Sequence, residues 1–383
     1  MTVRKDIQYI DSAPELASFC RQLATAGWFA LDTEFLREKT YYPKLCLLQI
    51  ATPDSVACID PLALANLDPI LDLIFDAGIT KVMHSARQDM EIFYHLRGAA
   101  PFPVFDTQVA ALLLGYPDQI GYGNLVSEVL DVNLEKLHTR ADWSLRPLTA
   151  DQIDYAADDV IYLVDVYRNL HARLVERERL AWLDEDFARL SSDALYSNPP
   201  ADAWLRVKGG NRLKGAALAV LQALADWRES LAQQRDRPRG WILRDDALVE
   251  IARQRPASVA ELGRIRGMQE AFIRHNGEHL IKLIAAAGKQ PPTPFPDAGL
   301  RLNLTPEQDA LVDVMSAVVR ISGIEHALNP AVLATRKQLE RLVSGDADVD
   351  IMHGWRRKLV GERLQALLNG ELSLSVRDGK LIL

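Results

Sequence analysis

The most constraining feature of this sequence is a pair of carboxylates inside an apolar segment, WFALDTEFL at residues 28–36. Its composition predicts a buried strand, in which alternate side chains share a face. Asp32 and Glu34 are two residues apart and would therefore project from the same face. Two adjacent carboxylates are costly in apolar surroundings, and a divalent cation relieves that cost most simply. The hard oxygen ligands suit Mg2+ or Mn2+, although a pair of this kind can also be solvated at a strand edge.

The first 200 residues alternate strand-like and helix-like segments, which predicts an α/β domain. Beyond Thr149, a suitable N-cap, apolar residues recur with the 3.6-residue period of a helix. The strands that we expect from short apolar runs are residues 28–36, 45–51, 56–60, 81–84 and 103–107.

Two proline-rich stretches, SNPPADAW (197–204) and QPPTPFPDAG (290–299), predict linkers. They leave residues 201–290 and 291–383, both of which contain amphipathic helical segments. We therefore expect three domains, an α/β domain at residues 1–200 followed by two all-α helical modules. The last module repeats the pattern of the middle one with weak sequence similarity.

The net charge of −8 argues against a nucleic-acid-binding protein, but the charge is unevenly distributed. Residues 1–200 carry a net charge of −13, residues 201–290 carry +6 and residues 291–383 carry −1. An acidic block followed by a basic one fits a carboxylate-rich site on one domain and phosphate contacts on the next, although solvated surface charge gives the same sums. The candidates for phosphate contacts are Arg235, Arg237, Arg239 and Arg244.

The sequence also excludes several classes of protein. No apolar run approaches the ~18 to 20 residues of a membrane span, and the N-terminus lacks the apolar core of a signal peptide. We expect a cytoplasmic protein that binds no membrane. The three cysteines, Cys20, Cys46 and Cys58, lack the spacing of a zinc site or a disulfide framework, so we expect neither.

Further candidate ligands follow the first pair. HSARQDMEIF places Asp89 near the start of a helix, where the chain returns to the carboxyl edge of the sheet and sites gather. A first-turn carboxylate is also favoured by the helix dipole alone. In IDYAADDVIYL, Tyr155 and Asp159 are four residues apart and share a helix face, although a charged helix surface would look the same. Together, the four carboxylates and the tyrosine could converge on two cations.

Three segments carry a resemblance to a known family. LDTEF, HSARQDMEIFYH and YAADDVIYL match in order and spacing the exonuclease motifs of the ribonuclease-H-like DEDD superfamily, in its tyrosine-bearing subclass. TYYPKLCLLQIA, FDTQVAALLLGY and DWSLRPLTADQ resemble the ribonuclease D family. The resemblance implies a ribonuclease-H-like exonuclease domain that uses two divalent metal ions, Mg2+ or Mn2+. It assigns metal ligation to Asp32, Glu34, Asp89 and Asp159, and a catalytic role to Tyr155.

The middle module resembles the helicase-and-RNase-D C-terminal (HRDC) domain over most of its length, from LADWRESLAQQ to SVAELGRI. HRDC domains bind nucleic acid or act in docking, so this resemblance implies capture of the substrate rather than chemistry. The last module resembles the same domain only faintly, and we expect a second, divergent HRDC-like domain at residues 291–383.

The resemblance implies a metal-dependent 3'-to-5' exoribonuclease that releases 5'-mononucleotides. Its expected partner is RNA, the 3' ends of tRNA precursors and other structured RNAs, and its expected state is a monomer. Phe35 and His84 adjoin the first two motifs and are candidates to contact the terminal nucleotides. Core packing explains Phe35 equally well, and a histidine that closes a buried strand is more often a structural group with satisfied hydrogen bonds. A 3'-to-5' DNA exonuclease and a catalytically silent nucleic-acid-binding scaffold are the alternatives. The presence of all five motif residues argues against the scaffold.

Overall fold

The computed structural model describes residues 6–134, 141–295 and 304–383. Contacts divide the chain into two compact units. Unit 1 comprises Met1–Glu34, Leu45–Leu195 and Arg301–Leu383, and unit 2 comprises Phe35–Lys44 and Tyr196–Leu300. Contacts therefore group the last module with the α/β domain, and the division into three domains at residues 200 and 290 stays a prediction.

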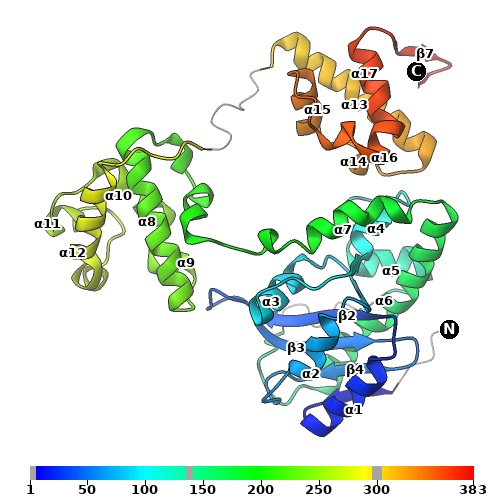
Figure 1. Cartoon of the computed structure of the whole chain (residues 1–383), viewed down its shortest axis with the longest axis horizontal. Helices are drawn as coiled ribbons and strands as arrows, with labels where there is room; N and C mark the ends of the chain where they lie inside the picture. Colours follow the sequence, from blue (N-terminus) through cyan, green and yellow to red (C-terminus); the bar gives the residue numbers. More distant parts are fainter. Residues whose placement is uncertain (1–5, 135–140, 296–303) are drawn as a thin grey trace. The chain divides into compact units, whose positions relative to one another are not determined.

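A six-stranded mixed sheet is the centre of unit 1, with the strand order β1-β4-β3-β2-β5-β6 (Figure 1). Strand β1 pairs in parallel with β4, β2 with β5 and β5 with β6, whereas β3 is antiparallel to β4. The carboxyl ends of β2, β5 and β6 therefore meet at one edge of the sheet. The strands are β1 (Ile7–Ile10), β2 (Trp28–Leu36), β3 (Lys44–Ala51), β4 (Val56–Ile59), β5 (Thr80–Met83) and β6 (Val104–Asp106).

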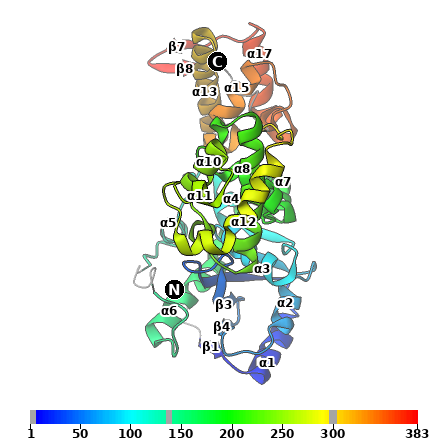
Figure 2. The same ribbon diagram turned by 90° about the vertical axis from the view of Figure 1, so that its left-hand side faces the viewer.

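Helices cover both faces of this sheet. Figure 2 shows α1 and α2 on one side and α6 on the other, where α6 packs on β1, β4 and β5. The N-terminus of α6 is fixed by a capping box, in which the Thr149 hydroxyl accepts the Gln152 amide and the Gln152 side chain accepts the Thr149 amide. The helices are α1 (Ala13–Leu23), α2 (Asp68–Ile74), α3 (Arg87–Arg97), α4 (Thr107–Leu112), α5 (Tyr122–Leu130), α6 (Ala150–Glu176) and α7 (Asp184–Leu190).

The last module belongs to unit 1 through direct contacts with the α/β domain. The rings of Trp182 and Trp355 stack with centroids 4.6 Å apart, and the Arg179 guanidinium donates a 2.6 Å hydrogen bond to the His326 carbonyl. The helices are α13 (Pro306–His326), α14 (Pro330–Leu333), α15 (Arg336–Val343), α16 (Gly354–Arg356) and α17 (Glu362–Leu368). The expected helical architecture is present, followed by a short hairpin of β7 (Ser375–Arg377) and β8 (Lys380–Ile382).

Unit 2 contains a helical core formed by α8 and the helices around it. Leu221, Leu224, Leu248 and Leu280 are fully buried in this core. The stretch SNPPADAW is not a free linker, because Trp204 within it is only 5% exposed and packs in the same core. The helices are the 3-10 helix η3 (Pro200–Arg206) and the α-helices α8 (Gly215–Gln234), α9 (Arg239–Ile242), α10 (Asp245–Gln254), α11 (Val259–Leu262) and α12 (Glu270–Ala287).

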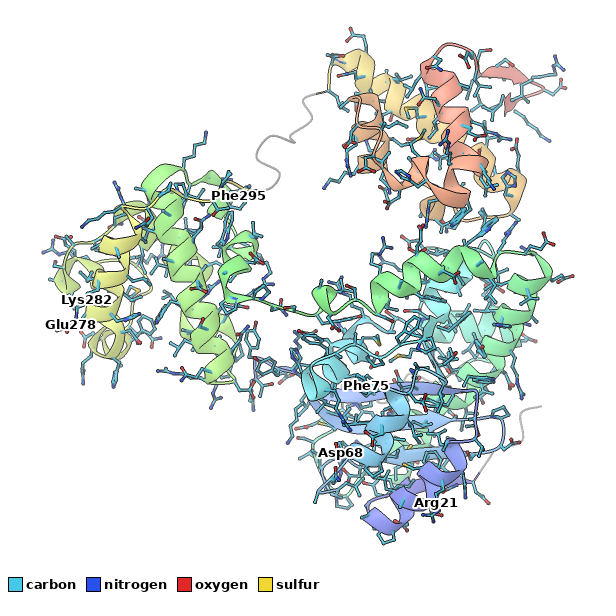
Figure 3. The ribbon with its side chains drawn as sticks, viewed as in Figure 1. Arg21, Asp68, Phe75, Glu278, Lys282 and Phe295 are labelled. Atoms are coloured by element: carbon cyan, nitrogen blue, oxygen red, sulfur yellow. The ribbon has the colours of Figure 1, made fainter. Side chains whose placement is uncertain are left out.

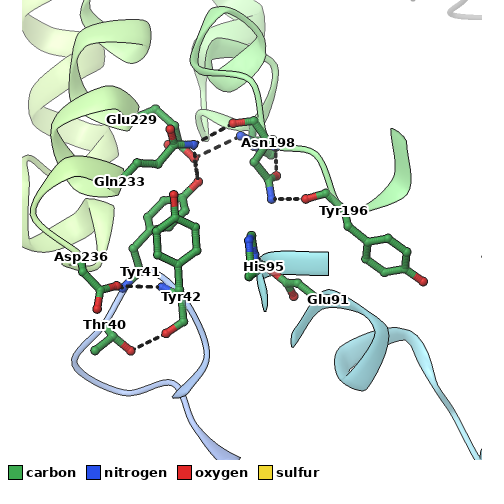
Figure 4. A network of polar contacts seen from close by, with 11 residues as sticks. Thr40, Tyr41, Tyr42, Glu91, His95, Tyr196, Asn198, Glu229, Gln233 and Asp236 are labelled. Carbon is green, nitrogen blue, oxygen red and sulfur yellow. Dashed lines mark hydrogen bonds and ion pairs between the residues drawn. The ribbon is translucent and has the colours of Figure 1, made fainter. Parts of the chain in front are cut away.

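The segment of residues 35–44 runs from the end of β2 to the start of β3 and belongs to unit 2, where its loop is fixed on α8 (Figure 4). The Tyr41 hydroxyl donates a 2.5 Å hydrogen bond to Glu229, a carboxylate that is only 1% exposed. The backbone amides of Tyr41 and Tyr42 both donate to the Asp236 carboxylate, at 2.9 and 3.0 Å. The conformation of this loop therefore depends on α8.

The structure bears on two of the expected exclusions. Across the described part of the chain, no helix is both long and apolar enough to cross a membrane. Cys20, Cys46 and Cys58 are all buried. A buried cysteine of this kind behaves as a small apolar residue.

Candidate active site

Four carboxylates from three elements interact at the carboxyl end of β2. Asp32 and Glu34 lie on β2, Asp89 lies in the first turn of α3, and Asp159 lies on α6. The pKa of Asp32 is raised well above its ordinary value by burial and by the charges of Asp89, Asp159 and Glu34, in that order. The structure thus brings together the four carboxylates that the motifs single out.

Burial, with a smaller contribution from neighbouring carboxylates, also raises the pKa values of the other three carboxyl groups. Burial, followed by the charges of Asp159 and Asp89, raises the pKa of Glu34 to about 8. Burial is the main cause that raises the pKa values of Asp89 and Asp159 to about 7 each. Ionising all four groups together is therefore unfavourable near neutral pH.

Asp89 and the turn before it are held by side chains to which the sequence assigned no role. The Thr33 hydroxyl donates a short hydrogen bond to Asp89. The turn before α3 is fixed by Asp106, whose carboxylate accepts the amides of Ser85 and Ala86 at 3.1 and 2.9 Å. Asp106 also caps α4. Its position at the end of β6 and directly before α4 is the sequence signal for this capping role.

Tyr155 faces the carboxylates from α6, one turn before Asp159. Burial and then the charges of Asp159, Glu34 and Asp32 raise the pKa of its hydroxyl. Its ring stacks on Trp143, with centroids 6.2 Å apart and an angle of 26° between the planes. The four-residue spacing thus brings Tyr155 close enough to Asp159 for the two groups to interact.

A second tyrosine, Tyr122, adjoins the same carboxylates and was not predicted. It begins α5, and its hydroxyl donates a 3.0 Å hydrogen bond to the backbone carbonyl of Asp158. Burial and the charges of Asp159 and Asp32 raise its pKa well above the ordinary value. No spacing links Tyr122 to Asp159 in the sequence, so only the packing of α5 against α6 reveals it.

The two candidates for nucleotide contacts have different surroundings. Both ring nitrogens of His84 are engaged, Nδ1 with the Thr107 hydroxyl at 3.0 Å and Nε2 with the Ile120 carbonyl at 3.1 Å. Burial lowers the pKa of His84, which favours a neutral, structurally bonded ring. Phe35 is half-buried and begins the loop fixed in unit 2. Contact of either residue with RNA stays a prediction.

The segment before α6 is anchored by Arg146. Its guanidinium donates to both carboxylate oxygens of Asp60, at 2.6 and 2.7 Å, and to the Cys46 carbonyl at 2.6 Å. A bidentate arginine–carboxylate pair is geometrically specific. Arg146 therefore links the ends of β4 and α6 and helps to place Tyr155 against β2.

The chemistry of the donor set fits hard divalent cations. Four carboxylates with raised pKa values repel one another, and a cation would offset that repulsion while accepting their oxygens as ligands. Yet no three His, Cys, Asp or Glu side chains in the described ranges surround a common point as a finished cage. Asp89, for example, is engaged by Thr33. Cation binding would therefore require some of these side chains to rotate.

Comparison with known proteins agrees with this arrangement. Residues 7–175 match the 3'-5' exonuclease domain family, and residues 217–284 match the HRDC domain family. Ribonuclease D of Nitrobacter hamburgensis is 40% identical over 97% of this chain and 98% of its own length. The chain belongs to the ribonuclease D family. Ribonuclease D of Pseudomonas paraeruginosa is also 40% identical, over 95% of this chain and 97% of its own length.

A solved member of the ribonuclease D family supports the fold. The crystal structure of Escherichia coli RNase D, described as an exoribonuclease involved in structured RNA processing, has a TM-score of 0.82 and 33% identity. It covers 95% of this chain and 99% of its own. The expected fold class is confirmed, and so is the enzyme class, a hydrolase with 3'-to-5' exoribonuclease activity. Exonucleases of this family generally depend on metal ions.

Proposed function

We propose that this member of the ribonuclease D family trims the 3' ends of tRNA precursors and other structured RNAs and releases 5'-mononucleotides. We further propose that the enzyme acts in the cytoplasm and is a monomer. The observation that carries the proposal is the convergence of Tyr155 with four interacting carboxylates at one end of the sheet. The description of the E. coli enzyme as acting on structured RNA supports this class of substrate.

Asp32, Glu34, Asp89 and Asp159 would hold two divalent cations, Mg2+ or Mn2+. When bound, such ions lower the pKa of a water molecule and stabilise the charge of a leaving oxygen during phosphodiester hydrolysis. The carboxylates supply the negative charge that concentrates cations at the site, and their burial keeps this charge poorly screened.

Tyr155 is suited to orient the attacking water rather than to deprotonate it. Burial and three neighbouring carboxylates raise the pKa of its phenol above the ordinary value of ~10, so the hydroxyl is protonated at neutral pH in the metal-free protein. A protonated hydroxyl can donate one hydrogen bond and accept another. Its packing on Trp143 restricts the ring and thereby the position of that hydroxyl.

The direct test of this function is incubation with 3'-extended and mature tRNA in the presence of Mg2+, with the product lengths resolved. We expect stepwise shortening of the extension and release of 5'-mononucleotides. Single-stranded RNA and DNA of the same sequence, compared side by side, distinguish a ribonuclease from a DNA exonuclease. Faster degradation of DNA, or cleavage inside the chain, would contradict the proposal.

Metal dependence gives a second test. Mg2+ or Mn2+ is expected to support hydrolysis, whereas Ca2+ is expected to bind without supporting it, because its looser coordination at ~2.3 to 2.6 Å misplaces the reacting water. Calorimetric titration measures the binding of each ion, and initial rates measure turnover. Activity with zinc alone would point to a site of a different kind.

The basic segment of unit 2 is proposed to capture RNA, and the structure separates its four arginines. Arg244 forms an ion pair with Asp246 at 3.2 Å, and Arg239 lies within electrostatic range of Asp245. Arg235 and Arg237 form no ion pair with any residue that the structure describes. We therefore assign the main phosphate contacts to these two arginines.

The double variant Arg235→Gln/Arg237→Gln is expected to bind structured RNA more weakly and with less dependence on salt. Each lost phosphate contact lowers the slope of log affinity against log salt by roughly 0.7 for a single strand, so we expect a decrease of about 1.4. Fluorescence anisotropy over a range of salt concentrations measures this slope. An unchanged slope would show that the two cations are ordinary solvated surface charge.

Removal of residues 201–290 is a less informative test of RNA capture by unit 2. The loop 35–44 continues directly from Glu34 and is fixed on α8 through Tyr41 and Asp236. Deletion would free this loop, which is continuous with β2. Point variants on the surface leave that attachment intact. Lys282→Gln, on the exposed face of α12 (Figure 3), is the matched control for loss of a positive charge.

A further inference from the structure

Trp241 is an exposed aromatic residue on the short helix α9 of unit 2. It is 61% exposed, whereas Trp204 of the same unit lies in the core and Trp227 packs edge-on against Phe272. Tryptophan is usually well buried, because its ring contributes a large apolar area. A single exposed apolar residue needs no functional explanation by itself. A function for Trp241 must therefore be inferred from the residues around it.

Two arginines, Arg235 and Arg237, precede the exposed indole. The guanidinium of Arg237 lies over the ring, 6.0 Å from its centroid, which is within the range of a cation–π contact. Neither Arg237 nor Arg235 forms an ion pair with a described residue. The intervening Asp236 is already engaged, because its carboxylate accepts the backbone amides of Tyr41 and Tyr42. The exposed ring is therefore combined with net positive charge.

The backbone around this ring is well fixed. Asp236 has a left-handed conformation with φ of 45°, and the Arg237 amide donates to the Ala232 carbonyl at 3.0 Å, which closes the end of α8 in a Schellman turn. The Trp241 amide donates to the Pro238 carbonyl at 2.8 Å. The backbone that carries the indole and its cation is thus held in place before any ligand arrives, which lowers the entropic cost of binding.

We propose that Trp241 is a stacking platform for an unpaired base of the RNA substrate, with Arg235 and Arg237 at the neighbouring phosphates. This inference rests on the proposed capture of RNA by unit 2. The two arginines alone would be enough to bind phosphate groups. An exposed indole beside them can in addition stack on the flat face of a base. Stacking is tolerant of sequence, because every base has such a face. That tolerance suits an exonuclease that must accept each successive nucleotide.

The test compares two RNA oligonucleotides of equal length on the full-length protein, in chelator so that no hydrolysis occurs. One is an ordinary single strand, and the other has abasic positions everywhere except the last few nucleotides at its 3' end. Both carry the same number of phosphates. The protein variants are Trp241→Leu, which keeps an apolar side chain without a ring, and Trp241→Phe, which keeps a ring.

We expect the wild-type protein to prefer the ordinary strand by about 5- to 150-fold, the range typical of one stacked base. Trp241→Phe should retain most of this preference, and Trp241→Leu should lose most of it. Binding of the abasic strand should be nearly equal for all three proteins. An undiminished preference in Trp241→Leu would overturn the platform. Because the ring is exposed, all variants should melt like the wild type.

The double variant Arg235→Gln/Arg237→Gln separates this inference from the function on which it rests. If it lowers the salt slope while Trp241→Leu keeps the full preference, unit 2 captures RNA but Trp241 is no platform. If neither variant changes binding, capture by this surface fails as well. Fluorescence provides an independent readout, because RNA should quench the wild-type emission more than that of Trp241→Phe.

Discussion

Replacing Asp32 by asparagine is expected to abolish hydrolysis while the metal-free protein remains folded and at least as stable as the wild type. Asp32 interacts with the other three carboxylates, so its loss removes both a cation ligand and a source of repulsion. Most substitutions of buried groups destabilise a protein. The expected result is the opposite, because the native carboxylate is held there at a cost in the absence of metal.

The pH dependence of stability makes the same prediction more specific. Unfolded aspartate and glutamate have pKa values of ~3.9 and ~4.3, whereas burial raises those of Asp89 and Asp159 to about 7 and that of Glu34 to about 8 in the folded state. Between these limits the folded state binds more protons than the unfolded state. The free energy of unfolding of the metal-free protein should therefore fall as the pH rises from about 4 to about 8.

Thermal or urea unfolding in chelator, at several pH values, measures this effect. The Asp32→Asn variant should show a shallower fall with pH than the wild type, because its remaining carboxylates repel one another less. Asp118→Asn, which removes an exposed carboxylate of unit 1, is the matched control and should follow the wild-type curve. Retained turnover, or a melting temperature many degrees below that of the wild type, would contradict the assignment.

The strands of the sheet could largely be predicted from the sequence, because most are short apolar runs buried on both faces. The expected strand at residues 28–36 coincides with β2, and the other four agree with β3 to β6 within one or two residues. Strand β1 was missed. Only two of its four residues are apolar, and only Ile10 is fully buried, so its pairing with β4 rather than its composition defines it.

The side chains that hold the site in place were harder to predict than its carboxylates. Some of the site residues share short local spacings, because Asp32 and Glu34 are two positions apart and Tyr155 and Asp159 are four positions apart. The contact between Thr33 and Asp89, by contrast, joins β2 to α3 across 56 positions, and Tyr122 reaches Asp158 across 36. Such contacts depend on how helices pack against the sheet and against each other, and no periodicity records this.

The charge of unit 2 shows the same limit. The sequence predicts one cluster of four arginines, whereas the structure pairs Arg244 with Asp246 and leaves Arg235 and Arg237 without ion pairs among the described residues. A sum of charges cannot show which ones are neutralised by neighbours. The sequence also could not distinguish Trp241 from the buried tryptophans, because the exposure of an aromatic ring depends on the packing of the whole domain.

Replacing Tyr155 by phenylalanine is expected to lower the rate of hydrolysis by about 10²- to 10⁴-fold with little change in metal affinity. The hydroxyl is proposed to orient the attacking water, whereas the carboxylates provide the ligands. Asp159→Asn, one helical turn away, should reduce both the rate and the affinity for metal. Single-turnover rates and metal titrations of each variant separate the two effects.

One matched control, Tyr122→Phe, tests whether the position of the Tyr155 hydroxyl matters, and a second, Asp158→Asn, tests the assignment of the helix face. Tyr122→Phe also removes a buried phenol beside Asp32 and Asp159, but its hydroxyl is bonded to the Asp158 carbonyl. We therefore expect Tyr122→Phe to lower stability more than the rate.

Asp158→Asn removes a carboxylate next to Asp159 in sequence and should cost far less activity than Asp159→Asn. If Asp158→Asn were inactive and Asp159→Asn active, the assignment of the helix face would be wrong by one residue, because Tyr155 shares its face with the residue four positions later.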